Sequence, residues 1–326
     1  MKSKFEIIIP TNRFNRYLDE ALSSCLSLKL SDKSIRVNIN SESEEFKNSK
    51  YWNHSEIQWR YSDKKNMDMY ESFNDAIRSS NAEWIFILSD DDVIHPNFLK
   101  NIDLNELNEN DLYATRIRTI DENGIVLGVQ ERNQKISLDN KNWFDDYFNL
   151  KINNHVSLFL FSKKLFNKVN GFSKSGYPNG YFMDTIFHGK LVANSDKIIF
   201  SDEVCFSRRV STFQEASKFY LDKRVNKYFD VIIDEMIKDN KFKVEILSRF
   251  TSKQHLKKHL LHLRFFTEWT KLNNPMFNVP RIKKLNFLKS FYFSWEVSMK
   301  NKLISFIYVL AYPIITALRP IIKKNK

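Results

Sequence analysis

Residues 84–88, which read WIFIL, form an uninterrupted apolar run that leads through Ser89 into three consecutive aspartates. A strand that is apolar on both faces fits the centre of a parallel sheet, where helices cover each face. Open α/β sheets bind their ligands at the carboxyl ends of such strands. The run therefore predicts an α/β fold and places Asp90, Asp91 and Asp92 at the ligand-binding edge of its sheet.

The sequence before this run alternates strand and helix patterns, as βαβ units do. Apolar residues recur on one face of residues 18–26, and Asp68 with Glu71 forms a capping-box pattern at the start of a second amphipathic helix. Strands are predicted at residues 5–10, 34–40, 56–61 and 83–88. We expect a Rossmann-like α/β fold with a mostly parallel sheet and helices on both faces.

The later part of the chain has a different pattern. The segment LYATRIRTIDENGIVLGV predicts a β-hairpin whose turn spans Asp121 to Gly124. Four of the six glycines fall between Gly171 and Gly189, which predicts a loop system in front of a short helix. We expect a domain at residues 1–215, with halves at 1–104 and 105–215, and a helical extension at 216–326.

The net charge of +12 belongs to the end of the chain. Residues 250–326 carry fifteen lysines and arginines against Glu268 and Glu296, so residues 1–249 are close to neutral. A basic, aromatic appendage on a neutral body predicts a contact with an anionic surface. It argues against a groove that follows nucleic-acid phosphates along the whole protein.

The same segment indicates that this surface is a membrane. Residues 303–318 are uncharged, are interrupted by Pro313 and have basic flanks, whereas a spanning helix needs roughly 20 apolar residues. Binding in the membrane interface fits better, although a spanning arrangement and an ordinary helical subdomain stay open. The first apolar run stops at Pro10, unlike a signal peptide, and Cys25 and Cys205 lie far apart. We expect the protein at the cytoplasmic face of the inner membrane, peripheral or monotopic.

The three aspartates predict a bound cation. Two carboxylates about 4 Å apart repel each other by ~4 kcal/mol at an effective dielectric constant near 20. Carboxylate oxygens without a nearby His or Cys suit Mn²⁺ or Mg²⁺, and such ions bridge a few carboxylates to substrate phosphates. The alternative is a solvated turn in which one aspartate caps the following helix.

Four segments resemble the nucleotide-sugar-binding half of family 2 inverting glycosyltransferases, which have the GT-A fold. They occur in order within residues 4–104 and read EIIIPTNRFNRYLDEALSSCL, IRVNINSES, NMDMYESFNDAI and AEWIFILSDDDVIHPNFL. A fainter resemblance continues to about residue 215. The resemblance implies a nucleotide-sugar donor, with UDP first. It also implies an acceptor in bacterial surface-polysaccharide synthesis, such as a lipopolysaccharide O-antigen, a capsule or a polyprenyl-diphosphate-linked sugar.

The resemblance assigns the divalent metal to the aspartate cluster, as a DXD motif. It implies Asp90 and Asp92 as the metal-side carboxylates, with Asp92 as the first choice for a direct ligand. Asp91 is a neighbour that could substitute, and Asp90 and Asp91 are both expected beside the nucleotide diphosphate.

The resemblance also implies contacts to the nucleoside. The loop after the first strand, expected to touch the nucleobase and ribose, consists of Pro10, Thr11, Asn12 and Arg13. The family usually ends its second strand with an aspartate that binds uracil, whereas this chain offers Ser41 or Glu42. The choice of nucleotide therefore stays open.

A late basic segment is expected to bind the diphosphate through Arg208 or Arg209, although the histidine that often follows in the family is absent. Phe73 stands where the family often has an arginine, so Arg13 and Lys64 are further candidates.

Asp184 resembles the catalytic base of the family. Inverting transfer needs a carboxylate that takes the proton of the acceptor hydroxyl, across the sugar from the metal. Asp184 follows the glycine-rich loop, and Met183 replaces the first residue of the usual Glu-Asp pair. The alternative role is a plain aspartate in the first turn of a helix.

We therefore expect a metal-dependent inverting glycosyltransferase. A nucleotidyltransferase of similar fold is one alternative, although no glycine-rich triphosphate loop follows the first strand. A catalytically inactive membrane-binding protein is another, and nucleic-acid binding is the least favoured reading.

Overall fold

The computed structural model describes residues 4–30, 32–64, 66–100, 102–129, 140–149, 152, 154–175, 180, 182–210, 225–261, 302–307 and 309. Four parallel strands form one half of a single sheet, in the order β3, β2, β1, β4. Their bounds are β1 (Phe5–Thr11), β2 (Lys33–Ile39), β3 (Ile57–Tyr61) and β4 (Trp84–Ile87). All four predicted strands are confirmed, and β4 is buried at every position.

The helices of this half are also those that the sequence predicts. Helix α1 (Leu18–Leu26) connects β1 to β2, and α2 (Met69–Arg78) connects β3 to β4. Asp68 and Glu71 form the predicted capping box at the start of α2. The two crossovers run in opposite directions along the sheet, so right-handed connections place α1 and α2 on opposite faces.

The strand order reverses between β1 and β4, because β1 leads to β2 on one side and has β4 on the other. In open α/β sheets this switch point forms the ligand-binding crevice. Thr11 at the end of β1 and the aspartates after β4 therefore share this crevice.

The second half of the sheet is mixed. Beyond β4 the order is β8, β6, β9, β5; β8 is antiparallel to β4 and β6, and β6 is parallel to β9. The bounds are β5 (Val93–Ile94), β6 (Leu112–Ile120), β7 (Val126–Val129), β8 (Phe159–Ser162) and β9 (Ile198–Arg209). Strands β6 and β7 form the predicted hairpin, and Asp121 and Gly124 close its turn.

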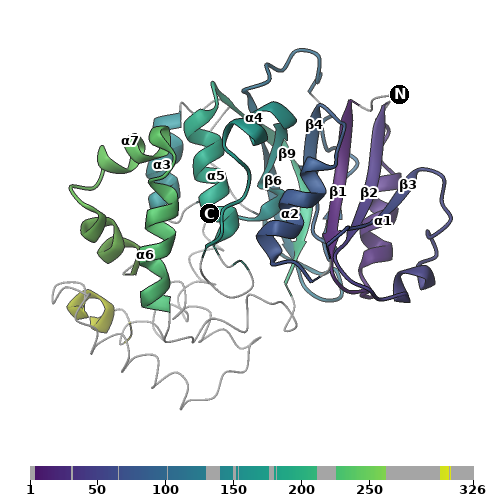
Figure 1. Cartoon of the computed structure of the whole chain (residues 1–326), viewed down its shortest axis with the longest axis horizontal. Helices are drawn as coiled ribbons and strands as arrows, with labels where there is room; N and C mark the ends of the chain where they lie inside the picture. Colours follow the sequence, from purple (N-terminus) through teal and green to yellow (C-terminus); the bar gives the residue numbers. More distant parts are fainter. Residues whose placement is uncertain are drawn as a thin grey trace, which may run out of the picture.

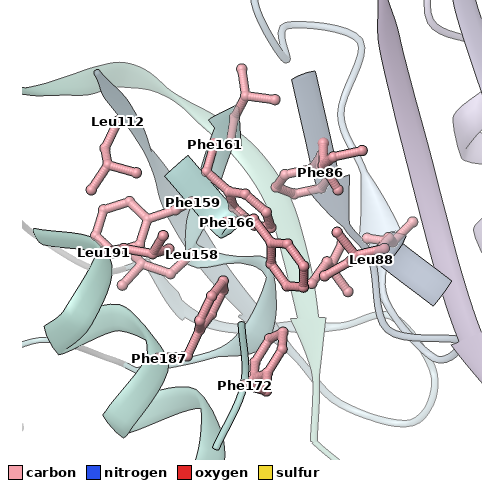
Figure 2. Close-up of a cluster of buried hydrophobic side chains, with 14 of the residues drawn as sticks. Phe86, Leu88, Leu112, Leu158, Phe159, Phe161, Phe166, Phe172, Phe187 and Leu191 are labelled. Atoms are coloured by element: carbon pink, nitrogen blue, oxygen red, sulfur yellow. The ribbon is translucent and has the colours of Figure 1, made fainter. Parts of the chain in front are cut away.

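Short helices complete the sheet region. They are η1 (Glu45–Asn48), η2 (Val156–Leu158) and α4 (Lys163–Lys168). An aromatic core lies directly behind the end of β4, where Phe86 and Leu88 face side chains of β8, α4 and α5 (Figure 2). This dense packing supports the loop that carries the aspartates.

Helices α3 (Asn140–Phe148), α5 (Met183–Asn194), α6 (Val225–Met236) and α7 (Asn240–Leu247) pack together beside the second half of the sheet (Figure 1). The ring of Phe242 in α7 lies so close to Gly189 in α5 that a Cβ there would be 2.2 Å from its Cζ. The first part of the predicted extension is thus helical and shares the core of the domain.

None of the helices in the described ranges is long and apolar enough to cross a membrane. Within residues 302–307, which are helical, Leu303, Ile304, Phe306 and Ile307 are exposed. The rest of the predicted membrane segment 303–318, apart from residue 309, lies outside the described residues. Membrane association stays a prediction.

Candidate functional site

The ends of β1, β2 and β4 meet at the switch point. The Thr11 hydroxyl donates a hydrogen bond to Asp90 Oδ2 at 2.6 Å, across the gap between β1 and β4. The Thr11 carbonyl accepts from the backbone N–H of Asn40 at 2.8 Å. The Asn40 amide in turn pairs with the backbone of Met67. The predicted nucleoside loop and the predicted aspartate cluster are therefore in direct contact.

Asp92 is the most enclosed of the three aspartates, at 1% exposure. Its Oδ1 accepts a hydrogen bond from the backbone N–H of Arg209 at 2.8 Å. Its Oδ2 is buried without a hydrogen bond to any described residue and lies 3.3 Å from His155 Nε2. A buried carboxylate oxygen that accepts no hydrogen bond points to an unseen ion or water.

The electrostatics of the cluster favour a cation. Burial, and then the charge of Asp91, raise the pKa of Asp90 to about 7 against the pull of Thr11 and Arg13. The same two causes raise the pKa of Asp92 well above its usual range. Ionisation of each carboxylate therefore costs free energy, and a nearby positive ion offsets that cost.

Histidine 155 was not predicted as a site residue. Burial, together with the charge of Arg208, lowers the pKa of His155 far below its usual range, so the ring is neutral. Its Nδ1 accepts from the backbone N–H of Ser157, which leaves the ring proton on Nε2, facing Asp92. The position of His155 follows from the antiparallel pairing of β8 with β4, which places the residues before β8 beside those after β4.

The guanidinium of Arg209 forms hydrogen bonds with other groups of the protein. Its guanidinium donates to the carbonyls of Asp91, Asp121 and Glu122 and to the carboxylate of Glu20, the last at 2.7 Å. The side chain is 1% exposed and its guanidinium also stacks over the ring of Tyr17. This geometry leaves the predicted diphosphate role to its neighbour Arg208.

Arg208 lies among the acidic groups of the site. Its positive charge lowers the pKa of both Asp92 and Asp184, against the larger effect of burial. Alternation along β9 turns the side chains of Arg208 and Arg209 to opposite faces. The structure therefore brings Arg208 within electrostatic range of the aspartate cluster and of the predicted base.

Asp184 lies in the first turn of α5, and the backbone just before this helix is strained. Phe182 adopts a left-handed conformation with φ of 70°, which costs a non-glycine residue about 1–2 kcal/mol, and its ring packs on Phe229. The Asp184 carboxylate accepts from the backbone N–H and the hydroxyl of Thr185. Burial raises the pKa of Asp184, which suits a general base near neutral pH.

The aromatic helices support α5 from behind. The Tyr147 hydroxyl donates to the carbonyl of Thr185 at 2.7 Å. Burial and the charge of Asp184 raise the pKa of Tyr147. His188 is buried against Phe159, and Asp145 pairs with Arg249 at 2.8 Å, so both serve the packing of the helices.

The remaining predicted residues surround the crevice. Pro10 is buried within β1, Asn12 and Arg13 are exposed just beyond it, and Ser41 and Glu42 follow the end of β2. The alternative cation Lys64 is 69% exposed and faces Glu71. Tyr177 and Tyr181, aromatic residues of the glycine-rich segment that could stack on an acceptor sugar, lie outside the described residues.

A metal ion fits this donor set when substrate phosphates complete it. Within the described ranges, no group of three or more His, Cys, Asp or Glu side chains is arranged to hold a metal by itself. Mg²⁺ and similar ions in nucleotide sites usually take only one or two carboxylates, and phosphates and water supply the rest. Asp92 Oδ2, which lies beside His155 but accepts no hydrogen bond, and the unfavourable burial of the charges on Asp90 and Asp92 match that arrangement.

Comparison with known proteins supports the fold. No protein-family profile and no curated protein matches the sequence. S. aureus TarS 1-349 in complex with UDP-GlcNAc matches with a TM-score of 0.61 and 16% identity, over 89% of this chain and 79% of that one. The mannosyltransferase PcManGT from Pyrobaculum calidifontis, in complex with GDP-Man and Mn²⁺, matches with a TM-score of 0.52 and 12% identity, over 96% and 81%. At these identities the likeness shows a shared GT-A-like fold, which confirms the α/β, GT-A-like part of the predicted fold class.

Proposed function

We propose that the protein is a metal-dependent glycosyltransferase of the inverting, family 2 type that uses a nucleotide-sugar donor. The observation that carries the proposal is that Thr11 contacts the aspartate cluster at the switch point, where the charge of Arg208 acts on both Asp92 and Asp184. Two similar structures that contain UDP-GlcNAc or GDP-Man with Mn²⁺ support this class of donor. UDP stays our first choice of nucleotide.

In this proposal the donor lies along the crevice. Asn12, Arg13, Ser41 and Glu42 contact the nucleoside. Asp90 and Asp92 hold the divalent cation, with Asp91 as the neighbour that can replace either. When bound, the cation would neutralise the negative charge that develops on the diphosphate as it leaves.

The other groups act on the diphosphate and the acceptor. Arg208 adds a second positive charge beside the leaving diphosphate. Asp184 takes the proton from the acceptor hydroxyl as that oxygen bonds to the anomeric carbon. In an inverting transfer the hydroxyl attacks the face of the sugar opposite the diphosphate, so the base and the metal-binding loop are expected on different segments, as Asp184 and the aspartate loop are.

We further propose a membrane-bound acceptor, such as a polyprenyl-diphosphate-linked sugar or a surface glycan. The basic charge of residues 250–326 and the exposed apolar residues of 302–307 support a site at the cytoplasmic face of the inner membrane. Each basic residue near an anionic leaflet contributes about 1 kcal/mol of attraction.

The decisive experiment is product analysis with a panel of UDP- and GDP-sugars, with Mn²⁺ and with EDTA. We expect release of nucleoside diphosphate that requires the metal, and an Asp184→Asn variant that folds but transfers no sugar. Glu203→Gln, a half-buried carboxylate within β9 and outside the site, is the matched control and should keep activity. Release of pyrophosphate from a nucleoside triphosphate would instead identify a nucleotidyltransferase, and full activity of Asp184→Asn would remove its role as base.

A further inference from the structure

Arg209 binds two successive residues of the aspartate loop. The backbone N–H of Arg209 binds Asp92 Oδ1 at 2.8 Å, and its Nε donates to the Asp91 carbonyl at 2.9 Å. Two successive residues of the loop are thus fixed, one through its side chain and one through its main chain. A turn hydrogen bond within the loop itself, from the Asp92 N–H to the Ser89 carbonyl, is longer at 3.2 Å.

The other end of Arg209 reaches two separate parts of the fold. Its Nη2 pairs with Glu20 on α1 at 2.7 Å, and its Nη1 donates to the carbonyls of Asp121 and Glu122 in the β6–β7 turn at 3.3 and 3.2 Å. Tyr17 covers the guanidinium at 4.3 Å. The loop is therefore tied to α1 and to the hairpin through one rigid group.

Arg209 does not serve as the counter-charge of the cluster. The hydrogen bond that it gives to the Asp92 carboxylate comes from its main chain. The guanidinium instead faces Glu20 and main-chain oxygens, so its effect on the aspartates is geometric.

We propose that Arg209 is a positioning residue that holds Asp91 and Asp92 in the arrangement that binds the divalent cation, with Glu20 as its outer anchor. The inference rests on the proposed function, because it concerns the same metal site. It assigns to Arg209 a role distinct from that of the adjacent Arg208: Arg208 faces the diphosphate, and Arg209 holds the metal ligands from behind.

Mn²⁺ binding in the presence of UDP, and separately of GDP, tests this role directly by the electron paramagnetic resonance signal of free Mn²⁺. Arg209→Lys keeps the charge, but one ammonium cannot reach Asp91, Glu20 and the hairpin carbonyls together. We expect its Mn²⁺ affinity to fall about tenfold or more, as for other residues that orient metal ligands. Glu20→Gln, at a position that is 51% exposed, should give a smaller loss without affecting folding.

Arg249→Lys is the matched control. Arg249 is also largely buried and bridges Asp145 and Glu245 between helices away from the site. Its replacement should lower thermal stability as Arg209→Lys does, yet leave Mn²⁺ affinity unchanged. A loss of Mn²⁺ affinity that is specific to the Arg209 and Glu20 variants cannot come from general destabilisation.

Each outcome decides the question. A folded Arg209→Lys protein with wild-type Mn²⁺ affinity overturns the inference while the proposed function stands. If Arg209→Lys does not fold, Glu20→Gln decides, and wild-type affinity in that variant overturns it. If the wild-type protein binds no Mn²⁺ with either nucleotide, the proposed metal site fails and the inference fails with it.

Discussion

Ionisation of Asp90 should destabilise the metal-free protein. Burial and the charge of Asp91 raise the pKa of Asp90 from 3.8 to about 7. A carboxyl group with a higher pKa in the folded state binds more protons when folded, so the free energy of unfolding falls as pH rises between the two pKa values. This stabilisation is fully present below pH 3.8 and is lost by about pH 7. From about pH 5 to about pH 7.5, the loss amounts to roughly 2 kcal/mol.

Buried histidines change stability in the opposite direction. Burial lowers the pKa of His95 to about 4 and that of His188 to about 3. These rings are neutral when folded, so they destabilise the protein below the ordinary histidine pKa and stop doing so as pH rises toward it. The pH profile of the wild-type protein alone therefore mixes two effects. The difference between wild type and Asp90→Asn isolates the carboxylate, and an asparagine still accepts the Thr11 hydrogen bond.

Denaturant unfolding in EDTA at the two pH values measures this difference. We expect Asp90→Asn to gain about 2 kcal/mol over wild type between about pH 5 and about pH 7.5. Asp63→Asn, at a side chain that is 99% exposed, should show a constant difference from wild type. Mn²⁺ with UDP should stabilise wild type at the higher pH more than it stabilises Asp90→Asn. A gain that does not grow with pH would refute the claim that the cluster holds unfavourable charge.

Two further predictions concern the diphosphate and the helix packing. Arg208→Gln should lower kcat/KM for the donor by tenfold or more, because a charge-assisted hydrogen bond contributes about 1.5–3 kcal/mol; unchanged donor kinetics would place the diphosphate elsewhere. Gly189→Ala adds a Cβ 2.2 Å from Phe242 Cζ, so the free energy of unfolding should fall by about 1–3 kcal/mol. In a Phe242→Leu background, Gly189→Ala should lower the free energy of unfolding by less than it does in the wild-type protein, as measured by denaturant unfolding. An equal decrease in both backgrounds would contradict the contact.

The first hundred residues were predictable because their signals are local. The continuous apolar run of β4, the apolar stripe of α1 and the capping box at Asp68 each specify an element through neighbours in sequence. Parallel strands then place their carboxyl ends at one edge, and there the structure joins Thr11 after β1 to Asp90 after β4 by a hydrogen bond. Here local patterns and topology lead to the same site.

The antiparallel half shows why other site residues were missed. Nothing in the local sequence marks His155 as a site residue, because many polar residues precede a short apolar strand. Its place beside Asp92 follows from the pairing of Trp84 with Ser162 and Phe86 with Leu160, which runs β8 back along β4. That pairing joins segments about 75 residues apart and leaves no periodic trace in either of them.

The adjacent arginines show the same limit at the scale of one residue. In sequence, Arg208 and Arg209 are equivalent candidates for the diphosphate, and strand geometry states only that they face opposite sides. The choice depends on what occupies each side. The register of β9 against β6 pairs Arg209 with Ile120, which places its guanidinium beside the hairpin turn and Glu20. A one-residue shift in this register would exchange the positions of the two side chains, so the strand pairing, and not the arginine pair itself, determines which of them is the proposed diphosphate ligand.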